Sequence, residues 1–531
     1  METPKDQKGK IARAAGIMSA ATFISRILGF GRDMIFAFYF GATGISDTFF
    51  QAFKIPNLLR ELLAEGSMSS AFVPVLTEYR QKQGEEEASR LVTITFTFIV
   101  IVVGLICLLG ILIAPAIVAV VSPGFVGSPE KFSLTVLLTR IMFPFLLFVS
   151  LAALLMGALN TKRVFFIPAL APAMLNITLI ASIILFESRA GQPIITAAVG
   201  VLVGGLVQFA FQLPSFFKNG YRLGLDTSFS HPGLRKMAFL IVPAILALSV
   251  GQINIIVGSI FASFLPQGSI TYLFYSMRLI QFPIGIFGVA MGMAVLPTLS
   301  EHAVRGELGR LREDFSFALR LLFFITIPSM AGLIALREPI VNLLFQRGQF
   351  DFAATQGTAE ALLYYSLGIW SIVGARVVTA TFYSMQDTKT PVKIAVIGML
   401  SNILLSFVLM GPLKHSGLAL ANTLASGISF ILLSYFLRRK LKTIEAGRIL
   451  SSFLRSVAAA AAMGLAGWAM LRGELWQKNG NSGLKAGYLS LTVLVCLGLY
   501  VFISYLLRSE ELHYLYDSVR KKLAGRGQKG A

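Results

Sequence analysis

Residues 25–65 read SRILGFGRDMIFAFYFGATGISDTFFQAFKIPNLLRELLAE, an apolar stretch that carries many charged side chains. These charges are Arg26, Arg32, Asp33, Asp47, Lys54, Arg60, Glu61 and Glu65. A cationic side chain at the centre of a bilayer helix costs about 2.5 to 3.5 kcal/mol, so it normally faces a water-filled cavity, a partner or a substrate. If the stretch spans a membrane, it therefore predicts a polar cavity.

Composition places the rest of the chain in a membrane as well. Of its 531 residues, 55% are hydrophobic and only 14% are charged, which does not fit a soluble globule. A spanning helix needs about 20 apolar residues. We expect an all-α polytopic membrane protein with fourteen transmembrane helices, near residues 15–40, 45–78, 91–121, 133–159, 164–186, 193–217, 237–264, 269–300, 316–336, 357–384, 391–411, 416–437, 452–471 and 487–507.

The net charge of +20 follows membrane topology rather than nucleic-acid binding. If the N-terminus is cytoplasmic, 31 of the 46 lysines and arginines fall in loops on that side, eight fall in the opposite loops, and seven lie in or at the edge of the spans. This asymmetry is the positive-inside pattern, and it predicts that both termini are cytoplasmic. The basic leader has no evident cleavage site, so the first helix is expected to direct insertion.

Two short repeats indicate that the chain contains two related lobes. Residues 73–78 read VPVLTE and residues 296–301 read LPTLSE, while 174–177 read MLNI and 400–403 read LSNI, at separations of 223 and 226 residues. Two six-helix lobes with the same topology are the parallel repeats of transporters that rock about a central site. The predicted divisions are an N-lobe 1–217, a cytoplasmic linker 218–236, a C-lobe 237–437, a second linker 438–451, two extra helices 452–507 and a basic cytoplasmic tail 508–531.

The charges within the spans indicate an anionic ligand. Six cations, with Arg278 and Arg376 added to the four of residues 25–65, stand against four acids. Arg26, Arg60 and Arg278 have no acid within three residues apart from Glu61 beside Arg60. Because the arginine fork donates two parallel hydrogen bonds to phosphate, three such groups favour a pyrophosphate. Glycine and proline breaks in the first two spans and in 237–264 and 269–300 favour these four helices as the cavity wall.

Several stretches together resemble the MurJ family of lipid II flippases, also called MviN. They are residues 25–33, 47–50, 53–60, 64–66, 72–74, 169–172, 261–265, 386–391 and 411–415, and they extend over nearly the whole chain. The resemblance implies the multidrug/oligosaccharidyl-lipid/polysaccharide exporter superfamily and transfer of an undecaprenyl-pyrophosphate-linked peptidoglycan precursor, lipid II, to the outer leaflet. It implies that Arg26, Arg60 and Arg278 bind the diphosphate, and that Arg32, Asp33 and Asp47 line the same cavity. The two extra helices would form a groove for the lipid tail.

Lys54, Glu65 and Arg376 complete the expected cavity and gating residues. We expect a transporter rather than an enzyme, with no cofactor, no metal site and no disulfide, since Cys107 and Cys496 lie inside apolar spans. The expected partners are lipid II and membrane lipids, without nucleic acid. The expected form is a monomer in the bacterial inner membrane.

The sequence departs from the family pattern in one region. Met277 stands where some members carry an acid, and no Asp or Glu occurs between Phe239 and Ser300. Direct sodium coupling through a carboxylate there is therefore not expected.

Alternative functions stay open at this point. The chain could carry another polyprenyl-pyrophosphate-linked glycan, or act as a drug antiporter of the same superfamily, although an antiporter for cations needs cavity carboxylates. An enzyme of polyprenyl phosphates would show paired acids for magnesium, and the acidic run 85–87 lies in a loop. A structural scaffold for cell-wall assembly would not need the intramembrane arginines. No G-x-x-x-x-G-K-[ST] motif supports ATP-driven transport.

Overall fold

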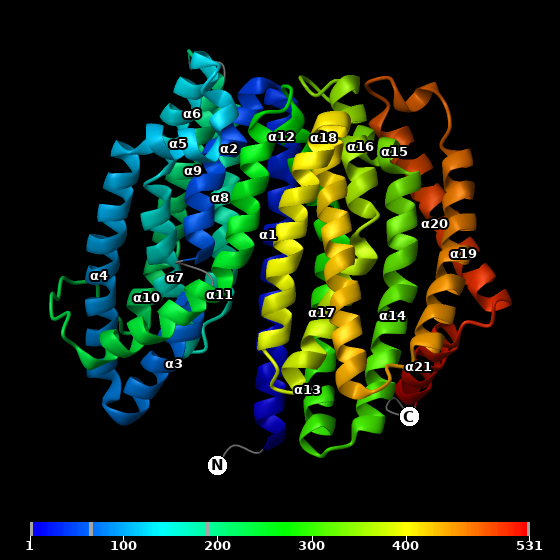
Figure 1. Ribbon diagram of the computed structural model, residues 1–531. Helices are drawn as coiled ribbons and strands as arrows, with labels where there is room; N and C mark the ends of the chain where they lie inside the picture. The colour runs from blue at the N-terminus through cyan, green and yellow to red at the C-terminus, as the bar shows by residue number, and fades with distance from the viewer. Residues whose placement is uncertain (1–3, 63–66, 187–190, 528–531) are drawn as a thin grey trace. The chain divides into compact units, whose positions relative to one another are not determined.

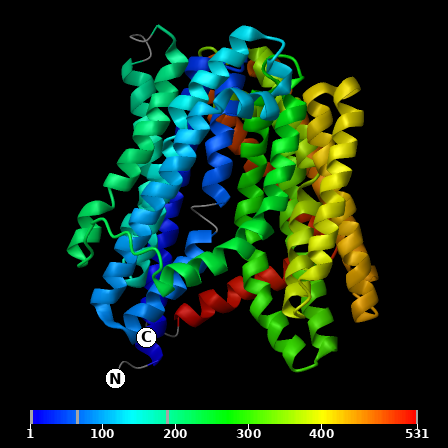
Figure 2. The same ribbon diagram turned by 60° about the vertical axis from the view of Figure 1, so that its left-hand side comes forward.

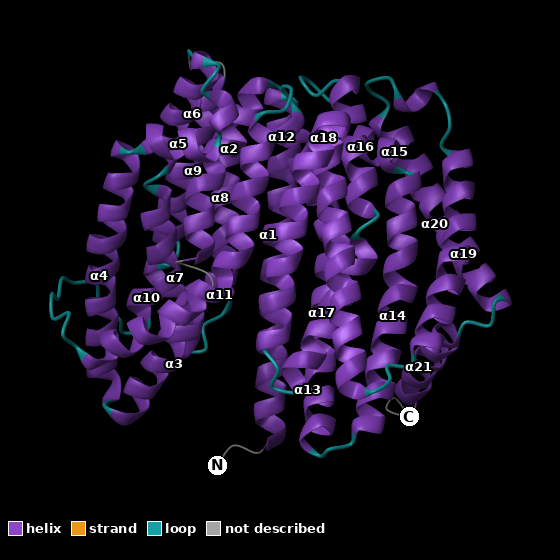
Figure 3. Ribbon diagram, viewed as in Figure 1, coloured by secondary structure: helices purple, strands orange, loops and turns teal. Residues whose placement is uncertain are grey.

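The computed structural model describes residues 4–62, 67–186 and 191–527, and all regular structure among them is helical (Figure 3). Ten of the described helical stretches are long and apolar enough to cross a membrane. Helices suit that environment because their backbone N–H and C=O groups bond within the same segment. The all-α membrane class is therefore confirmed. Contacts divide the chain into two compact units, residues 1–270 and residues 271–531.

The first unit contains the helices coloured blue to green in Figure 1, together with a short 3₁₀ turn, η2. Their bounds are α1 Pro4–Phe40, α2 Gly44–Arg60, α3 Ser67–Lys82, α4 Gly84–Leu112, α5 Ala114–Val121, η2 Pro123–Phe125, α6 Pro129–Met142, α7 Phe145–Thr161, α8 Phe166–Phe186, α9 Pro193–Ala210, α10 Leu213–Lys218 and α11 Pro232–Ser263.

The second unit contains the helices coloured green to red, with α12 beginning at the division between the units (Figure 1). Their bounds are α12 Ser269–Pro283, the π-helical turn η4 Ile284–Val289, α13 Ala290–Val304, α14 Leu308–Ala335, α15 Arg337–Phe345, α16 Phe352–Ser366, α17 Ile369–Ser384, α18 Lys389–Leu441, α19 Ala446–Met470, the 3₁₀ turn η5 Glu474–Trp476, α20 Ser482–Leu506 and α21 Glu510–Gly527.

Helix α18 consists of two helices joined by a tight turn. Its backbone leaves the helical region at Lys414, where φ is 49° and ψ is −130°. A Cβ at Gly417 would lie 2.2 Å from the carbonyl oxygen of Leu409, so the chain passes too close to itself for any other residue there. The turn falls between the predicted spans 391–411 and 416–437.

Asp387 holds the start of α18 in place. It belongs to residues 386–391, one of the stretches that carry the family resemblance. Its carboxylate accepts hydrogen bonds from the Thr390 amide at 3.1 Å and from Lys440 Nζ at 2.8 Å. The lysine and the helix amide hold the pKa of Asp387 down, to about 2. A depressed carboxylate pKa contributes stability that is present above its unfolded value of about 3.9 and is lost as the pH falls toward the folded value.

Helix α11 packs with the first unit. It contacts α3, α4, α5 and η2. Lys236 near its start donates to Glu78 Oε2 at 2.5 Å, and Ser263 at its end accepts from the Gly124 amide at 3.0 Å. The sequence repeat places this helix in the lobe 237–437, whereas contacts group it with residues 1–270. Repeats record sequence similarity and contacts record packing, so the lobe boundaries stay a prediction.

The last helices of the second unit are tied at both ends. Arg320 on α14 pairs with Glu510 at 2.6 Å and with the buried Glu511 at 3.1 Å. At the other end, the buried Lys485 donates to Asn342 Oδ1 at 2.9 Å. Helix α21 runs across the direction of the other helices of this unit (Figure 2). These contacts join α21 to α14 and α20 to α15, and α19 packs along α14.

Close packing in the first unit predicts an intolerant glycine on α4. A Cβ at Gly110 would lie 2.1 Å from the ring of the buried Phe143, whereas one at Gly104 on the same helix meets nothing within 4 Å. Gly110→Ala should therefore destabilise the protein by about 1 to 3 kcal/mol through overpacking. Thermal unfolding of the purified protein in detergent measures this.

Gly104→Ala is the matched control, since alanine improves helix propensity by about 0.8 to 1 kcal/mol without a clash. It should leave the unfolding midpoint unchanged or raise it. Equal midpoints for the two variants would contradict the packing of Gly110 against Phe143.

Candidate functional site

The charged residues of α1 divide into a paired set and an exposed cation. Arg32 donates to Asp33 Oδ1 through Nη2 at 2.6 Å and Nε at 3.0 Å, and through Nη1 to Asn176 Oδ1 at 3.2 Å. Asp33 is only 3% exposed. An ion pair with this geometry removes most of the cost of keeping both charges inside a span. The two charges of the pair therefore compensate each other.

Asn176 joins this pair to α8. Its amide nitrogen is 3.3 Å from the carbonyl oxygen of Ser25 on α1 and 3.4 Å from that of Pro172 on its own helix. The Asn176 oxygen accepts a hydrogen bond from Arg32, so both the oxygen and the nitrogen of the amide are hydrogen-bonded, and the side chain is almost fully buried. Asn176 thus sets the position of the guanidinium of Arg32 relative to α8.

Arg26 lies less than two turns before Arg32 on the same helix and has a different environment. Its side chain is exposed and makes no hydrogen bond or ion pair with any residue that the structure describes. A guanidinium without an internal partner can donate to an anionic ligand without first breaking a bond. Arg26 is therefore a cation available to a ligand in the first unit.

Asp47 on α2 has a backbone partner. Its carboxylate is 3% exposed and accepts a hydrogen bond from the amide of Gly268 at 2.6 Å. Gly268 has a φ of 88° and directly precedes α12. A short bond to a charged acceptor is a strong one, so Asp47 holds the turn after α11 against α2.

A second contact joins α2 to α11. Lys54 Nζ donates to Ser259 Oγ at 2.8 Å, and Gln51 Nε2 donates to the carbonyl oxygen of the same serine at 3.0 Å. Ser259 is fully buried. Because Lys54 has a neutral partner here, its positive charge is not cancelled by this bond.

The end of α2 carries a polar cluster around Arg60. Arg60 Nε donates to Asn57 Oδ1 at 3.0 Å, and its Nη2 lies 3.9 Å from Glu61 Oε1. Gln252 on α11 donates to Glu61 Oε2 at 2.9 Å. The side chain of Arg60 stays 22% exposed, so the cluster orients the guanidinium without covering it. Glu65, the remaining acid predicted here, lies outside the described residues.

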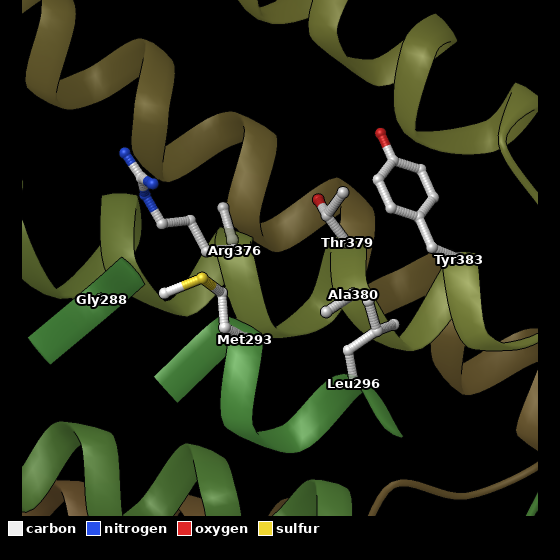
Figure 4. A pocket seen from close by; sticks show the side chains of 9 residues that line it. Gly288, Met293, Leu296, Arg376, Thr379, Ala380 and Tyr383 are labelled. Carbon is white, nitrogen blue, oxygen red and sulfur yellow. The ribbon is translucent and has the colours of Figure 1, made fainter. Parts of the chain in front are cut away.

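The other two predicted cations belong to the second unit. Arg278 is half-buried on α12. Arg376 on α17 is exposed, makes no hydrogen bond or ion pair with any described residue, and lines a groove of about 360 Å³ (Figure 4). The structure therefore places Arg26 and Arg60 in the first unit and Arg278 and Arg376 in the second.

The part of the chain that the structure describes contains no evident site for a metal ion. No three histidine, cysteine, aspartate or glutamate side chains there come together to hold a metal ion. Cys107 and Cys496 are both buried and carry free thiols.

Sequence reasoning missed the neutral partners of the charged residues. They are Gln51, Asn176, Gln252 and Ser259. Each is a polar residue within an apolar span, which is a weak signal because serine and asparagine also serve in ordinary helix packing. Asn176 stood out only as part of the repeat at 174–177.

Comparison with known proteins gives one consistent family. The family model "Lipid II flippase MurJ" matches residues 36–486. A probable lipid II flippase MurJ of Vibrio cholerae is 35% identical over 510 residues, covering 94% of this chain and 96% of the relative. The lipid II flippase MurJ of Burkholderia cenocepacia is 35% identical over 432 residues, covering 81% and 84%.

Solved structures agree in fold. A lipid II flippase MurJ in an inward closed conformation has a TM-score of 0.75 at 29% identity, covering 92% of this chain and 98% of that one. An inward-facing multidrug resistance MATE transporter of the MOP superfamily has a TM-score of 0.66 at 13% identity, covering 81% and 99%. At that identity the second likeness concerns the fold alone.

The contact of Asp47 predicts a large effect of one substitution. Asp47→Ala removes the acceptor from the buried Gly268 amide and should lower the stability by about 1 to 3 kcal/mol. Asp47→Asn keeps an oxygen acceptor and loses only the charge, so its loss should be smaller. Thermal unfolding of both purified variants tests this, and an alanine variant as stable as the asparagine variant would refute the contact.

Proposed function

The chain belongs to the lipid II flippase MurJ family, and on that premise we propose that it carries lipid II across the membrane. The undecaprenyl-pyrophosphate-linked headgroup moves from the inner to the outer leaflet while the lipid tail stays in the bilayer. The protein acts as a transporter rather than an enzyme, as a monomer in the bacterial inner membrane. Its working cycle is alternating access, in which a cavity opens to one side at a time.

The proposed topology has fourteen spans with both termini in the cytoplasm. Two six-helix lobes share one orientation, and the last two spans, 452–471 and 487–507, are additional. The distribution of lysine and arginine over the loops supports this orientation. The sequence repeats at a separation of 223 to 226 residues support the lobes.

One observation carries the proposed mechanism: Arg26 is an exposed cation on α1, which the sequence predicts to span the membrane, and it has no partner among the described residues. Such a charge needs water or an anion. We assign Arg26 the pyrophosphate of the substrate, together with Arg60 and Arg278, which are partly exposed residues on α2 and α12. In the proposed role, these cations replace the water that a pyrophosphate loses on entering the membrane.

The remaining charged residues support this set. The Arg32–Asp33 pair and Asn176 brace α1, which carries Arg26. Asp47 and Lys54 bind α2 to α11 and its following turn through Gly268 and Ser259, so they act in gating. Glu65 and Arg376 are assigned to the same cavity as gating and lining residues.

The reset of the empty transporter is driven by the membrane potential. A cationic cavity that has released its anion is drawn toward the negative interior, by about 2.3 kcal/mol per charge per 100 mV for a full crossing. A carboxylate-based sodium site is not part of the proposal, since residues 240–299 contain no Asp or Glu.

Arg26→Ala should abolish or strongly reduce lipid II transfer. A charge-assisted hydrogen bond contributes about 1.5 to 3 kcal/mol, so the loss should be about tenfold or more. The measurement is growth and outward lipid II transfer in bacteria depleted of their own flippase, with membrane levels of each variant checked by immunoblot. Arg26→Lys should retain part of the activity because it keeps the charge.

Arg310→Ala is the matched control, since Arg310 is a surface cation with 67% exposure beside Glu307. It should support normal growth. If Arg26→Ala does so too, Arg26 does not bind the substrate; if the parent chain itself restores neither growth nor transfer, the proposed substrate is wrong.

Collapse of the potential should slow turnover. Liposomes that contain the protein and lipid II, with a potassium gradient and valinomycin to set the potential, allow the rate to be compared with and without the gradient. The rate should fall when the potential is removed. An unchanged rate would exclude the electrical reset while leaving the binding roles of the arginines in place.

A further inference from the structure

Two arginines of the first unit each stand next to an acid in the sequence, and the two pairs differ in geometry. Arg32 Nη2 lies 2.6 Å from Asp33 Oδ1, whereas Arg60 Nη2 lies 3.9 Å from Glu61 Oε1. A hydrogen bond between an arginine and a carboxylate is about 2.7–2.9 Å long, so the second pair is not bonded directly. Glu61 therefore compensates the charge of Arg60 less than Asp33 compensates that of Arg32.

The two oxygens of Glu61 accept hydrogen bonds from neutral amides instead. Asn57 Nδ2 donates to Oε1 at 3.2 Å, and Gln252 Nε2 donates to Oε2 at 2.9 Å. Asn57 lies one turn earlier on α2, whereas Gln252 belongs to α11 and is 191 positions away from Glu61 in the sequence. Of these two donors, Gln252 is the one that holds the carboxylate from another helix.

The same cluster fixes the direction of the guanidinium. Asn57 Oδ1 accepts a hydrogen bond from Arg60 Nε at 3.0 Å while its amide nitrogen donates to Glu61. Asn57 thus bonds to both the acid and the base. A chain of hydrogen bonds therefore runs from Gln252 on α11 through Glu61 and Asn57 to Arg60.

Glu61 is able to reach Arg60 if it loses this support. Asp33 reaches Arg32 from the next position of a helix, and Glu61 directly follows Arg60 with helical backbone angles, φ −62° and ψ −38°. The attraction between the two charges favours a direct bond, which is stronger than a bond to a neutral amide. The bonds from the amides are what keep the acid and the base apart.

The amide of Gln252 is hydrogen-bonded at its nitrogen only. Its Oε1 is buried and accepts no hydrogen bond from any residue that the structure describes. Turning the amide over would place this oxygen against the Glu61 carboxylate, so the contact with Glu61 determines its orientation. A buried acceptor without a partner lowers stability, and an apolar side chain of the same length would avoid that loss. Packing therefore does not account for a glutamine at this position, whereas the contact with Glu61 does.

We propose that Gln252 is a positioning residue for the pyrophosphate site, because it holds the Glu61 carboxylate away from Arg60 and so allows the guanidinium to bind the pyrophosphate. The inference rests on the proposed function, which assigns Arg60 to the pyrophosphate, and it adds a residue of α11 to that assignment. Gln252 does not touch the substrate in this role. Without its amide, Glu61 closes on Arg60 as Asp33 closes on Arg32, and the substrate has to break an ion pair before it binds.

The test measures the dissociation constant of lipid II for the full-length protein in lipid nanodiscs, with thermal unfolding as the check that each variant folds. Gln252→Met keeps the length of the side chain and removes the amide. It should weaken lipid II binding about three- to tenfold, the range of one hydrogen bond, because Glu61 then competes with the pyrophosphate. Gln252→Asn is one methylene too short to reach Glu61 and should give the same loss, which keeps the test valid if Gln252→Met does not fold.

Removal of the competing acid separates positioning from a merely structural role. Glu61→Gln should strengthen lipid II binding, because it removes a negative charge beside the pyrophosphate. The double variant Glu61→Gln with Gln252→Met should bind as Glu61→Gln does, because no carboxylate remains to close on Arg60. A structural role of Gln252 predicts instead that the double variant binds at least as weakly as Gln252→Met.

Gln208→Met is the matched control. Gln208 is a glutamine of α9 that is 9% exposed, and its side chain makes no hydrogen bond to a described residue. This variant should leave the affinity for lipid II unchanged. Undecaprenol, which resembles the lipid tail without the pyrophosphate, should bind equally to all variants.

The outcomes separate this inference from the proposed function. A double variant that regains the affinity lost in Gln252→Met supports the positioning role. A double variant as weak as Gln252→Met, or a Gln252→Met variant that binds as the parent does, overturns it while the flippase function stands. A parent protein that does not bind lipid II overturns the flippase function and the positioning role with it.

Discussion

The requirement to satisfy every polar group inside hydrocarbon determines this structure at two levels. At the level of the backbone it requires helices, and the described residues form helices throughout their regular structure. At the level of the side chains it requires that each charge within a span has a partner or water. Residues 25–62 show how the chain meets the second requirement, because most of their charges have specific partners.

Those partners divide the charges by role. Arg32 and Asp33 bond to each other and to Asn176, and Asp47 bonds to the Gly268 amide. Such groups stabilise helix packing and would be costly to expose or to leave unpaired. Arg26 is different, since its guanidinium is exposed and without a partner among the described residues. A list of the charged residues alone cannot distinguish these roles, whereas the contacts of each residue do.

Helix α11 has a special position in this arrangement. Near its start Lys236 pairs with Glu78, in its middle Gln252 donates to Glu61, and near its end Ser259 accepts a hydrogen bond from Lys54. The Gly268 amide in the turn that follows donates to Asp47. These polar contacts join α11 and the turn after it to α2 and α3 within the first unit. Because hydrogen bonds are short-range and directional, these contacts fix the position of α11 relative to α2 and α3.

The groove that Arg376 lines depends on backbone geometry as much as on side chains. The turn η4 and the small residues Gly288 and Gly292 create space, and the regular spacing of α17 fills its edge with polar groups. In a membrane protein, small residues commonly allow helices to approach closely. Gly288 serves that purpose against Val373, whereas Gly292 leaves its space open.

The all-α membrane class and the family could be predicted from the order of residues, whereas the count of fourteen spans stays a prediction. Hydrophobic runs and loop charges are local features of the sequence, so they can be recognised without the tertiary structure. The break near Lys414 was predicted in this way. The family followed from motifs such as residues 25–33 and 386–391, which are also local. Contacts between distant residues were out of reach. Asp47 and Gly268 are 221 positions apart and Lys54 and Ser259 are 205 apart, and only folding brings each pair within hydrogen-bonding distance. Whether a buried charge is paired depends on such neighbours, so the distinction between Arg26 and Arg32 and the groove beside Arg376 required the tertiary structure.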